Sequence, residues 1–384
     1  MATLFRLRFV PLLFLIYLGV ESGQAQDWNE NLQIHGYASQ GFLFSSKNNY
    51  LTTRSSQGSL QWTDGVISVT DSVTDKLRVG MQFHMYQLGQ LGGSQVELDW
   101  ASGDYRLNDQ LGFRAGKIKT VFGLFTDSQD VEPIFLWVLL PQSLYPIDNR
   151  DYMLSELGGE IYGRVNLGRG RGALRYHAQG GEASLEEDEG YMQQLAGYGL
   201  IFARAPGGSI WGGDLRWETP IRGWSVGASA VVQDMNGTAE QGAVRVTRFF
   251  SPVYYSQFER GKWFFAGEYN RAPVNPTLFF GTEGFAWPLD QRSWYLMGSY
   301  RVTDKLQVGT YYSHYVNRAA DTALPENYSK DWVIAGRYDF NSFLYGKVEG
   351  HFLQGTGLGY YSNTNPDGLQ TNSRILAARI GFTF

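Results

Sequence analysis

The sequence contains no cysteine, and beyond its first twenty residues it has no long apolar run. Without cysteine, neither a disulfide nor a thiolate metal site can stabilise the fold. A transmembrane helix requires about 20 consecutive apolar residues, so the chain is not a helical membrane protein, in keeping with its mean hydropathy of −0.28. The formal net charge is −5, and this acidic balance argues against nucleic acid as a partner.

The one apolar run lies at the start of the chain and has the order of an export signal. Arg6 and Arg8 precede twelve apolar residues at 9–20, and the small residues Gly23 and Ala25, at the −3 and −1 positions, predict cleavage after Ala25. This order is typical of a Sec-type signal peptide, and the run is too short to span a bilayer. Residues 1–25 are therefore expected to be removed, which leaves 26–384 as the mature chain.

The mature chain is rich in aromatic residues and glycine, and apolar and polar residues alternate along it. This alternation is clearest at the C-terminus, where Leu376, Ile380 and Phe382 alternate with Ala377, Arg379 and Gly381. Successive side chains of a strand point to opposite faces, so this period of two gives each strand one apolar and one polar face. The fold class is therefore all-β.

The alternating segments are about ten residues long, and the connections between them are alternately short turns and long polar loops. This order predicts a transmembrane antiparallel β-barrel. In lipid every backbone N–H and C=O group must be paired, which a closed barrel achieves. We favour sixteen strands; eighteen result if the region 191–260 is divided further. A soluble β-sandwich or β-propeller would show the same alternation, but charges at strand centres and the lack of a blade-length repeat argue against it.

Three stretches of the sequence resemble a known family. Residues 113–124, 140–146 and 158–163 look like the segments around the constriction loop of sixteen-stranded porins, in particular the phosphate-selective porin O/P and DcaP-like group. This resemblance implies that residues 121–156 fold into the barrel and narrow it, and that the protein is a homotrimer. The terminal Phe384 resembles the signal read by the barrel assembly machinery. One feature departs from the family: the charged residues within 121–156 are acidic except for Arg150, so phosphate selectivity is not expected.

These features predict a porin of the Gram-negative outer membrane, surrounded by lipid and lipopolysaccharide, through which small hydrophilic solutes or ions diffuse passively. A basic wall facing an acidic loop would place a transverse field across the constriction. No metal or cofactor is expected. The predicted pore-lining residues are Arg114, Lys117, Lys119, Asp127, Asp130, Glu132, Arg164, Arg175, Arg337, Lys347 and Arg379.

Two other functions remain open at this stage. An outer-membrane phospholipase or protease could assemble its site from separate strands, and His177 near Ser184 is the pair that such an enzyme would use. However, the five histidines are isolated and the HExxH and GxSxG motifs are missing, so we do not expect an enzyme. A non-conducting structural barrel is the second alternative.

Overall fold

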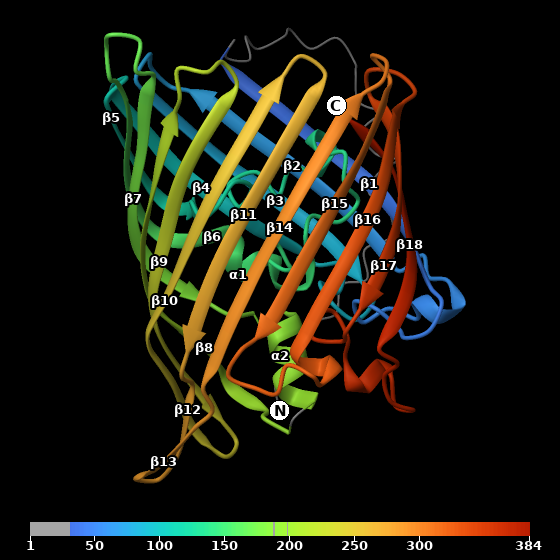
Figure 1. Cartoon of the computed structure of the whole chain (residues 1–384). Coiled ribbons are helices and arrows are strands. Elements are labelled where there is room, and N and C mark those ends of the chain that lie inside the picture. Colours follow the sequence, from blue (N-terminus) through green and yellow to red (C-terminus); the bar gives the residue numbers. More distant parts are fainter. Residues whose placement is uncertain (1–30, 187–188, 198) are drawn as a thin grey trace, which may run out of the picture.

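The computed structural model describes residues 31–186, 189–197 and 199–384, so the predicted signal peptide lies outside the described residues. The chain forms one antiparallel sheet that closes on itself (Figure 1). Strand β1 pairs with β2 on one side and with β18 on the other, for example Tyr37 with Val66 and Thr383. First and last strands therefore complete the barrel, as the alternating sequence predicts.

Within the described residues, sixteen strands form the wall of the barrel. They are β1 (Leu32–Ser45), β2 (Trp62–Ser72), β3 (Leu77–Leu88), β4 (Val96–Asn108), β5 (Leu111–Lys119), β6 (Ser155–Asn166), β7 (Ala173–Ser184), β8 (Phe202–Glu218), β9 (Trp224–Ala239), β10 (Gly242–Arg260), β11 (Trp263–Val274), β14 (Leu289–Arg301), β15 (Leu306–Asn317), β16 (Tyr328–Asp339), β17 (Leu344–Gln354) and β18 (Asn372–Thr383).

The remaining elements lie in the loops. Strands β12 (Thr277–Phe280) and β13 (Glu283–Ala286) form a hairpin that pairs with the start of β10 and extends beyond the barrel, at the bottom of Figure 1. The helices are α1 (Arg150–Leu154) and α2 (Gly190–Gly197), with short 3-10 turns at Ser55–Gln57, Glu132–Ile134, Ile147–Asn149, Pro325–Asn327 and Ser362–Thr364. No helix among the described residues is long and apolar enough to cross a membrane.

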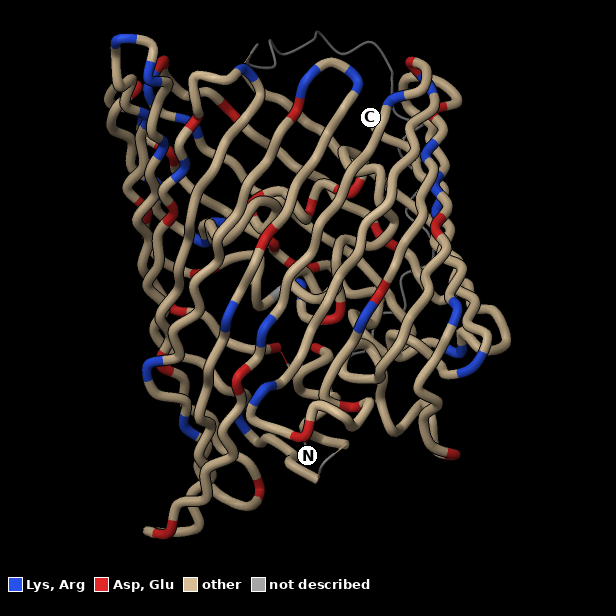
Figure 2. Tube along the Cα trace, viewed as in Figure 1, with Lys and Arg blue, Asp and Glu red and all other residues tan. Residues whose placement is uncertain are grey.

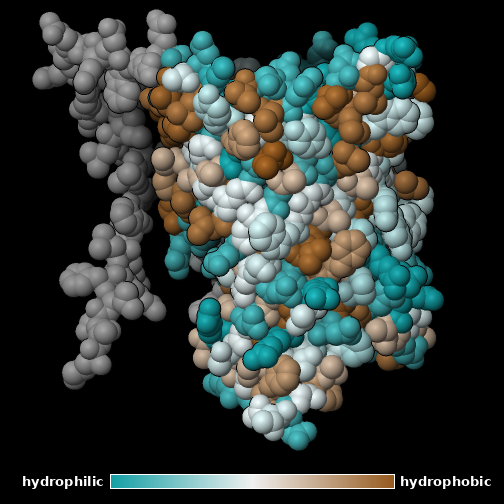
Figure 3. All heavy atoms as spheres, turned by 90° about the vertical axis from the view of Figure 1, so that its left-hand side faces the viewer, coloured by the Kyte–Doolittle hydropathy of each residue, from teal (hydrophilic) through white to brown (hydrophobic). Residues whose placement is uncertain are grey.

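The two faces of the wall have the reverse of a soluble protein's polarity. On β17, Val348 and Phe352 point outward and are 50% and 52% exposed, whereas the inward-pointing Lys347, Glu349 and His351 are at most 4% exposed. Figure 3 shows apolar and weakly polar residues over the upper and middle part of one outer face, with hydrophilic residues at its rim and lower end. Apolar outside and charged inside is the arrangement expected of a barrel in lipid.

The region 191–260, which left the strand number open, resolves into long strands. Residues 206–208 are not a connector but lie within β8, where the pairing with β9 shifts between Arg204 and Gly207. Ser251 and Pro252 likewise lie inside β10. The true connector between β9 and β10 is the two-residue turn at 240–241, which has no Pro or Gly of its own and gave no strong turn signal.

Candidate functional site

The segment between β5 and β6, residues 120–154, folds into the barrel, and we call it the inserted loop. Its outline agrees with the predicted 121–156, except that β6 already begins at Ser155. Apolar residues of the loop pack against inward-pointing side chains of β10, β11 and β14 to β16. Others pack against β1 to β3, β17 and β18. Burying these apolar side chains away from water is favourable, so the contacts hold the loop against this part of the wall.

Carboxylates of the wall also bind the backbone of the inserted loop. Glu349 accepts hydrogen bonds from the N–H groups of Val138 and Leu139 at 2.8 and 3.0 Å. Glu268 accepts one from the N–H of Leu124 at 3.1 Å and another from the Tyr145 hydroxyl. Irregular backbone inside a barrel must find hydrogen-bond partners, and these two carboxylates provide them.

Three of the predicted lining residues attach the loop near Glu132 instead of facing open water. Lys347 forms a buried ion pair with Glu132 and donates to its backbone oxygen at 2.8 Å. Arg337 donates to the backbone oxygen of Phe135 at 2.9 Å, and Arg379 lies 3.7 Å from the Glu132 carboxylate. These side chains therefore act as attachments between strand and loop.

A second charged cluster joins the loop to β3, β4 and β5. Asp130 is 1% exposed, pairs with Lys119 at 2.7 Å and accepts a hydrogen bond from Gln82 at 2.6 Å. Arg150 reaches Asp99 at 2.8 Å, at a point where β4 bulges against β3. The bulge places the additional residue, Asp99, inside the barrel. Lys119 and Asp130 thus lie in a buried contact, not on a free surface.

The opposite inner wall is different, because among the described residues neither apolar cluster of the inserted loop includes a residue of β4 to β9. This wall carries a charged patch, which we call the charged wall: Asp104, Arg114, Glu160, His177, Asp214 and Arg216. Arg114 bonds Asp104 at 3.1 Å and Glu160 at 2.8 Å, and the side chains of Arg114 and Asp104 remain 27% and 24% exposed. Water therefore reaches the charged wall inside the barrel.

On the loop side, Asp127 faces this wall. Its side chain is exposed, unlike its neighbours Phe125 and Thr126, and it lies close enough to Asp214 and Arg216 to interact with both charges. An acidic loop residue that faces a charged wall is an arrangement that can select solutes by charge.

The remaining predicted lining residues lie elsewhere. Arg164 and Arg175 both pair with Glu218 on the inner face, near the end of the barrel that carries the short turns. This end is at the top of Figure 2, which shows many basic residues there. Lys117 points outward: it is paired across the sheet with Leu157, which is 64% exposed. We therefore leave Lys117 out of the lining. Phe384 follows β18 and exchanges backbone hydrogen bonds with Gly36.

Most of the charged wall was missed by sequence reasoning. The alternation puts Glu160 and His177 on the polar face of their strands, but it does not show that His177 pairs with Glu160 across the sheet. The hypothetical enzyme pair is not formed. His177 and Ser184 lie seven residues apart on β7, roughly 23 Å at strand spacing and on opposite faces.

Comparisons with known proteins agree on the fold. No family model and no curated protein matches the chain. Among solved structures, it is similar to OmpF of Salmonella typhi in complex with daunomycin (15% identity, TM-score 0.59, 92% of this chain and 97% of that one). The trimer form of OmpT, an outer membrane protein of Vibrio cholerae, matches at 11% identity and TM-score 0.58, over 92% and 99% of the chains.

A third similar structure is the outer membrane channel DcaP of Acinetobacter baumannii (9% identity, TM-score 0.55, 92% of this chain and 97% of that one). Identities this low indicate shared architecture and do not single out the phosphate-selective group. The closed antiparallel wall and the loop folded against its inner face therefore give this chain the fold of the sixteen-stranded porins, as its sequence resemblance predicts.

Proposed function

We propose that this protein is an outer-membrane porin, through which small hydrophilic solutes and ions diffuse passively between the inserted loop and the charged wall. The observation that carries the proposal is the one-sided apolar packing of the loop. Apolar packing holds it against β10, β11, β14 to β18 and β1 to β3, together with the buried ion pair of Lys347 and Glu132, while the charged wall opposite remains partly exposed to water.

The surroundings that this function requires are part of the same proposal. The apolar outer face would contact lipid, with lipopolysaccharide at the end that carries the long loops. A Sec-type signal at 1–25 would direct export, and Phe384 would be read by the barrel assembly machinery. One structure of the same fold is described as a trimer, and we propose a homotrimer here. No catalytic role is proposed.

Single-channel recording of the purified protein in planar bilayers tests the function. We expect a steady open-channel conductance and, in asymmetric KCl, a reversal potential that shows little selectivity or a mild preference for cations. Asp127→Lys should shift the reversal potential toward anions, because it reverses a charge that faces the charged wall.

Asp109→Lys is the matched control, since Asp109 lies in the short turn between β4 and β5 with its side chain 87% exposed. The same change of two charges there should move the reversal potential much less, because salt screens an exposed charge within about 10 Å. A folded barrel that conducts no ions would refute the porin and favour the structural alternative.

A further inference from the structure

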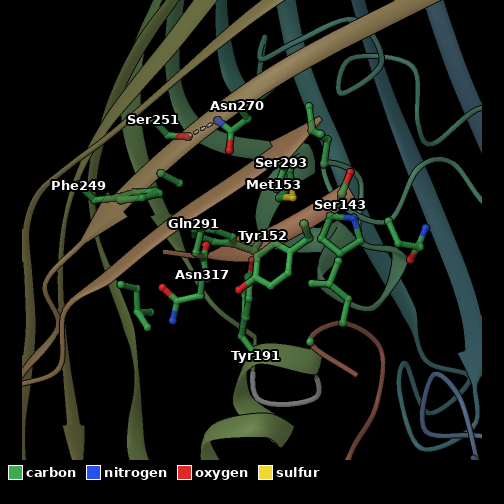
Figure 4. A pocket seen from close by; sticks show the side chains of 18 of the residues that line it. Ser143, Tyr152, Met153, Tyr191, Phe249, Ser251, Asn270, Gln291, Ser293 and Asn317 are labelled. Carbon is green, nitrogen blue, oxygen red and sulfur yellow. Dashed lines mark hydrogen bonds between the residues drawn. The ribbon is translucent and has the colours of Figure 1, made fainter. Parts of the chain in front are cut away.

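A cavity of about 420 Å³ lies between the inserted loop and the loop-side ends of the strands. It is bounded by the inserted loop, α1, α2 and the inner faces of β8 to β11, β14 and β15 (Figure 4). Its volume falls within the range of small-molecule sites, about 300–1,000 Å³. It is distinct in composition from the charged wall described above.

The cavity is almost free of charge. Among the described residues that line it, Glu326 is the only ionisable acid or base apart from tyrosines. A charged ligand would lose hydration on entering and, apart from Glu326, find no counter-charge, which is costly. The lining therefore favours an uncharged ligand.

Several polar groups that line the cavity have hydrogen-bonding capacity to spare. Gln291 and Ser293 are two residues apart on β14, so both point inward, and neither side chain has a hydrogen-bond partner among the described residues. Asn270 uses its amide N–H groups on Ser251 and Pro252, at 2.8 and 3.0 Å, which leaves its carbonyl oxygen available.

In Asn317 the carbonyl oxygen is occupied and the amide N–H groups are available, the reverse of Asn270. The Asn317 carbonyl oxygen accepts hydrogen bonds from the N–H groups of Asp290 and Ala319, at 3.1 and 3.2 Å, which leaves its amide N–H groups available. Asn317 is 7% exposed and Ser293 is 3% exposed. A ligand that fits must therefore offer both donors and acceptors at several points, as hydroxyl groups do.

Aromatic rings provide part of the apolar lining, beside aliphatic side chains such as Ile210 and Val231. Tyr152 and Tyr191, from α1 and α2, lie on one side of the cavity, and Phe249 of β10 lies on another (Figure 4). The Tyr152 hydroxyl donates to Gln233, which orients its ring. Flat rings beside amide groups can contact the C–H face of a sugar ring while the amides bind its hydroxyls.

We propose that this cavity is a binding subsite for an uncharged, polyhydroxylated solute of the sugar class. The subsite deepens the proposed porin function and rests on it, since it would hold the solute on the loop side of the constriction. Sugars satisfy each requirement of the lining: they are neutral, they carry adjacent hydroxyls that donate and accept, and they have apolar C–H faces.

Binding is tested without any need for conduction, by calorimetric titration of the detergent-solubilised full-length protein with sucrose. We expect saturable binding that weakens about 3- to 10-fold in Gln291→Ala and in Phe249→Ala, the usual effect of removing one hydrogen bond or contact. Gln307→Ala is the matched control. Gln307 is also an inward-facing glutamine, but it lies at the turn end of β15, hydrogen-bonded to Ser299 at 3.0 Å.

A second titration compares glucose with its charged relatives glucuronate and glucosamine. We expect glucose to bind more tightly than either. Circular dichroism verifies that each variant retains its barrel, and Gln291→Leu, which keeps the side-chain volume, replaces Gln291→Ala if that variant does not fold. Absence of saturable sucrose and glucose binding, or binding of glucuronate as tight as that of glucose, would overturn the subsite.

The conductance experiment separates the two proposals. A protein that conducts salt but binds no sugar remains a porin without this subsite. Sugar binding by a barrel that conducts no ions would support the subsite and refute the porin.

Discussion

At the scale of single residues, the ion pair of Lys347 with Glu132 shows how a barrel can bury charge. The Lys347 side chain is fully buried and that of Glu132 is 8% exposed. Lys347 also donates to the backbone oxygen of Trp137 at 3.3 Å. A buried pair is expensive to form, but it is more expensive to break, because the remaining charge is then buried alone.

Lys347→Met should therefore lower the free energy of unfolding by about 3–5 kcal/mol and loosen the inserted loop around Glu132. Thermal unfolding in detergent measures the first effect, and protease cleavage within 120–154 measures the second. Glu132→Gln added to Lys347→Met should restore part of the loss, since it removes the unpaired charge.

Arg164→Met is the control for the buried pair. Arg164 is 48% exposed and pairs with Glu218 at 2.6 Å, so its loss should lower the free energy of unfolding far less than the loss of Lys347, because solvent screens an exposed ion pair. Equal effects of the two substitutions would contradict the attachment role of Lys347.

Asp148 joins the inserted loop to the last long loop. The Tyr361 hydroxyl donates to its carboxyl, as does the side-chain amide of Asn149 at 3.0 Å. Burial raises the pKa of Asp148, although these hydrogen bonds oppose the shift. A raised pKa means that the contact is strongest when the carboxyl is protonated, below its unfolded pKa, and that it weakens as pH rises through the folded pKa.

Asp148→Asn should remove this pH dependence and strengthen the contact at neutral pH, because the amide carries no charge and keeps an oxygen to accept from Tyr361. Hydrogen exchange of residues 355–371 at pH 4 and pH 7 provides the measurement. From pH 4 to pH 7, amide exchange of these residues in the wild type should rise by more than the increase in the intrinsic exchange rate. In the variant it should rise only by the intrinsic increase. The same pH response in both proteins would exclude Asp148 as its source.

At the scale of elements, the inserted loop is placed by contacts with strands far away in the chain. The Ser143 hydroxyl lies 2.8 Å from the Ser313 hydroxyl of β15, 170 positions later. The chain has no cysteine of its own, so a pair introduced here has no competing partner.

Ser143→Cys combined with Ser313→Cys should form a disulfide on oxidation, because facing side chains this close suit its geometry. Faster migration of the denatured, non-reduced protein in gel electrophoresis would report the cross-link. Conductance should stay close to the wild-type value, since the loop is already in place. Ser143→Cys with Ser299→Cys, at the turn end of β14, should not cross-link, and a bond there would contradict the placement of the loop.

At the scale of the whole molecule, stability in lipid depends on an unbroken apolar outer wall. Val348 is 50% exposed and lies mid-strand on β17, whereas Tyr338 is 43% exposed and lies near the turn end of β16. The two residues share the outer face but differ in depth.

Val348→Arg should cost about 2–4 kcal/mol in a bilayer, and Tyr338→Arg about 0–1 kcal/mol, because the penalty for a charge falls toward the membrane surface. Unfolding by denaturant in lipid vesicles measures both. Equal costs, or no cost for Val348→Arg, would mean that this wall does not face lipid.

The sequence by itself determined the wall of this barrel. Period two is a local property, and it is enough to place Val348 outside and Lys347 inside without knowing any partner. The inserted loop, by contrast, was expected only from the resemblance to porin segments, which placed it at 121–156, whereas β6 begins at Ser155. The sequence was weakest at the turn 240–241, where no turn residue marks the change of direction.

Only the tertiary structure decided which inward-facing residues meet. Lys347 and Glu132 are 215 positions apart, and alternation makes them equivalent to every other polar side chain on that face. Their contact exists because the sheet closes and the loop folds across it, which brings distant positions together. For the same reason Arg337, Lys347 and Arg379, predicted to face water, bind the loop, while the charged wall and the neutral cavity became visible only once the barrel was closed.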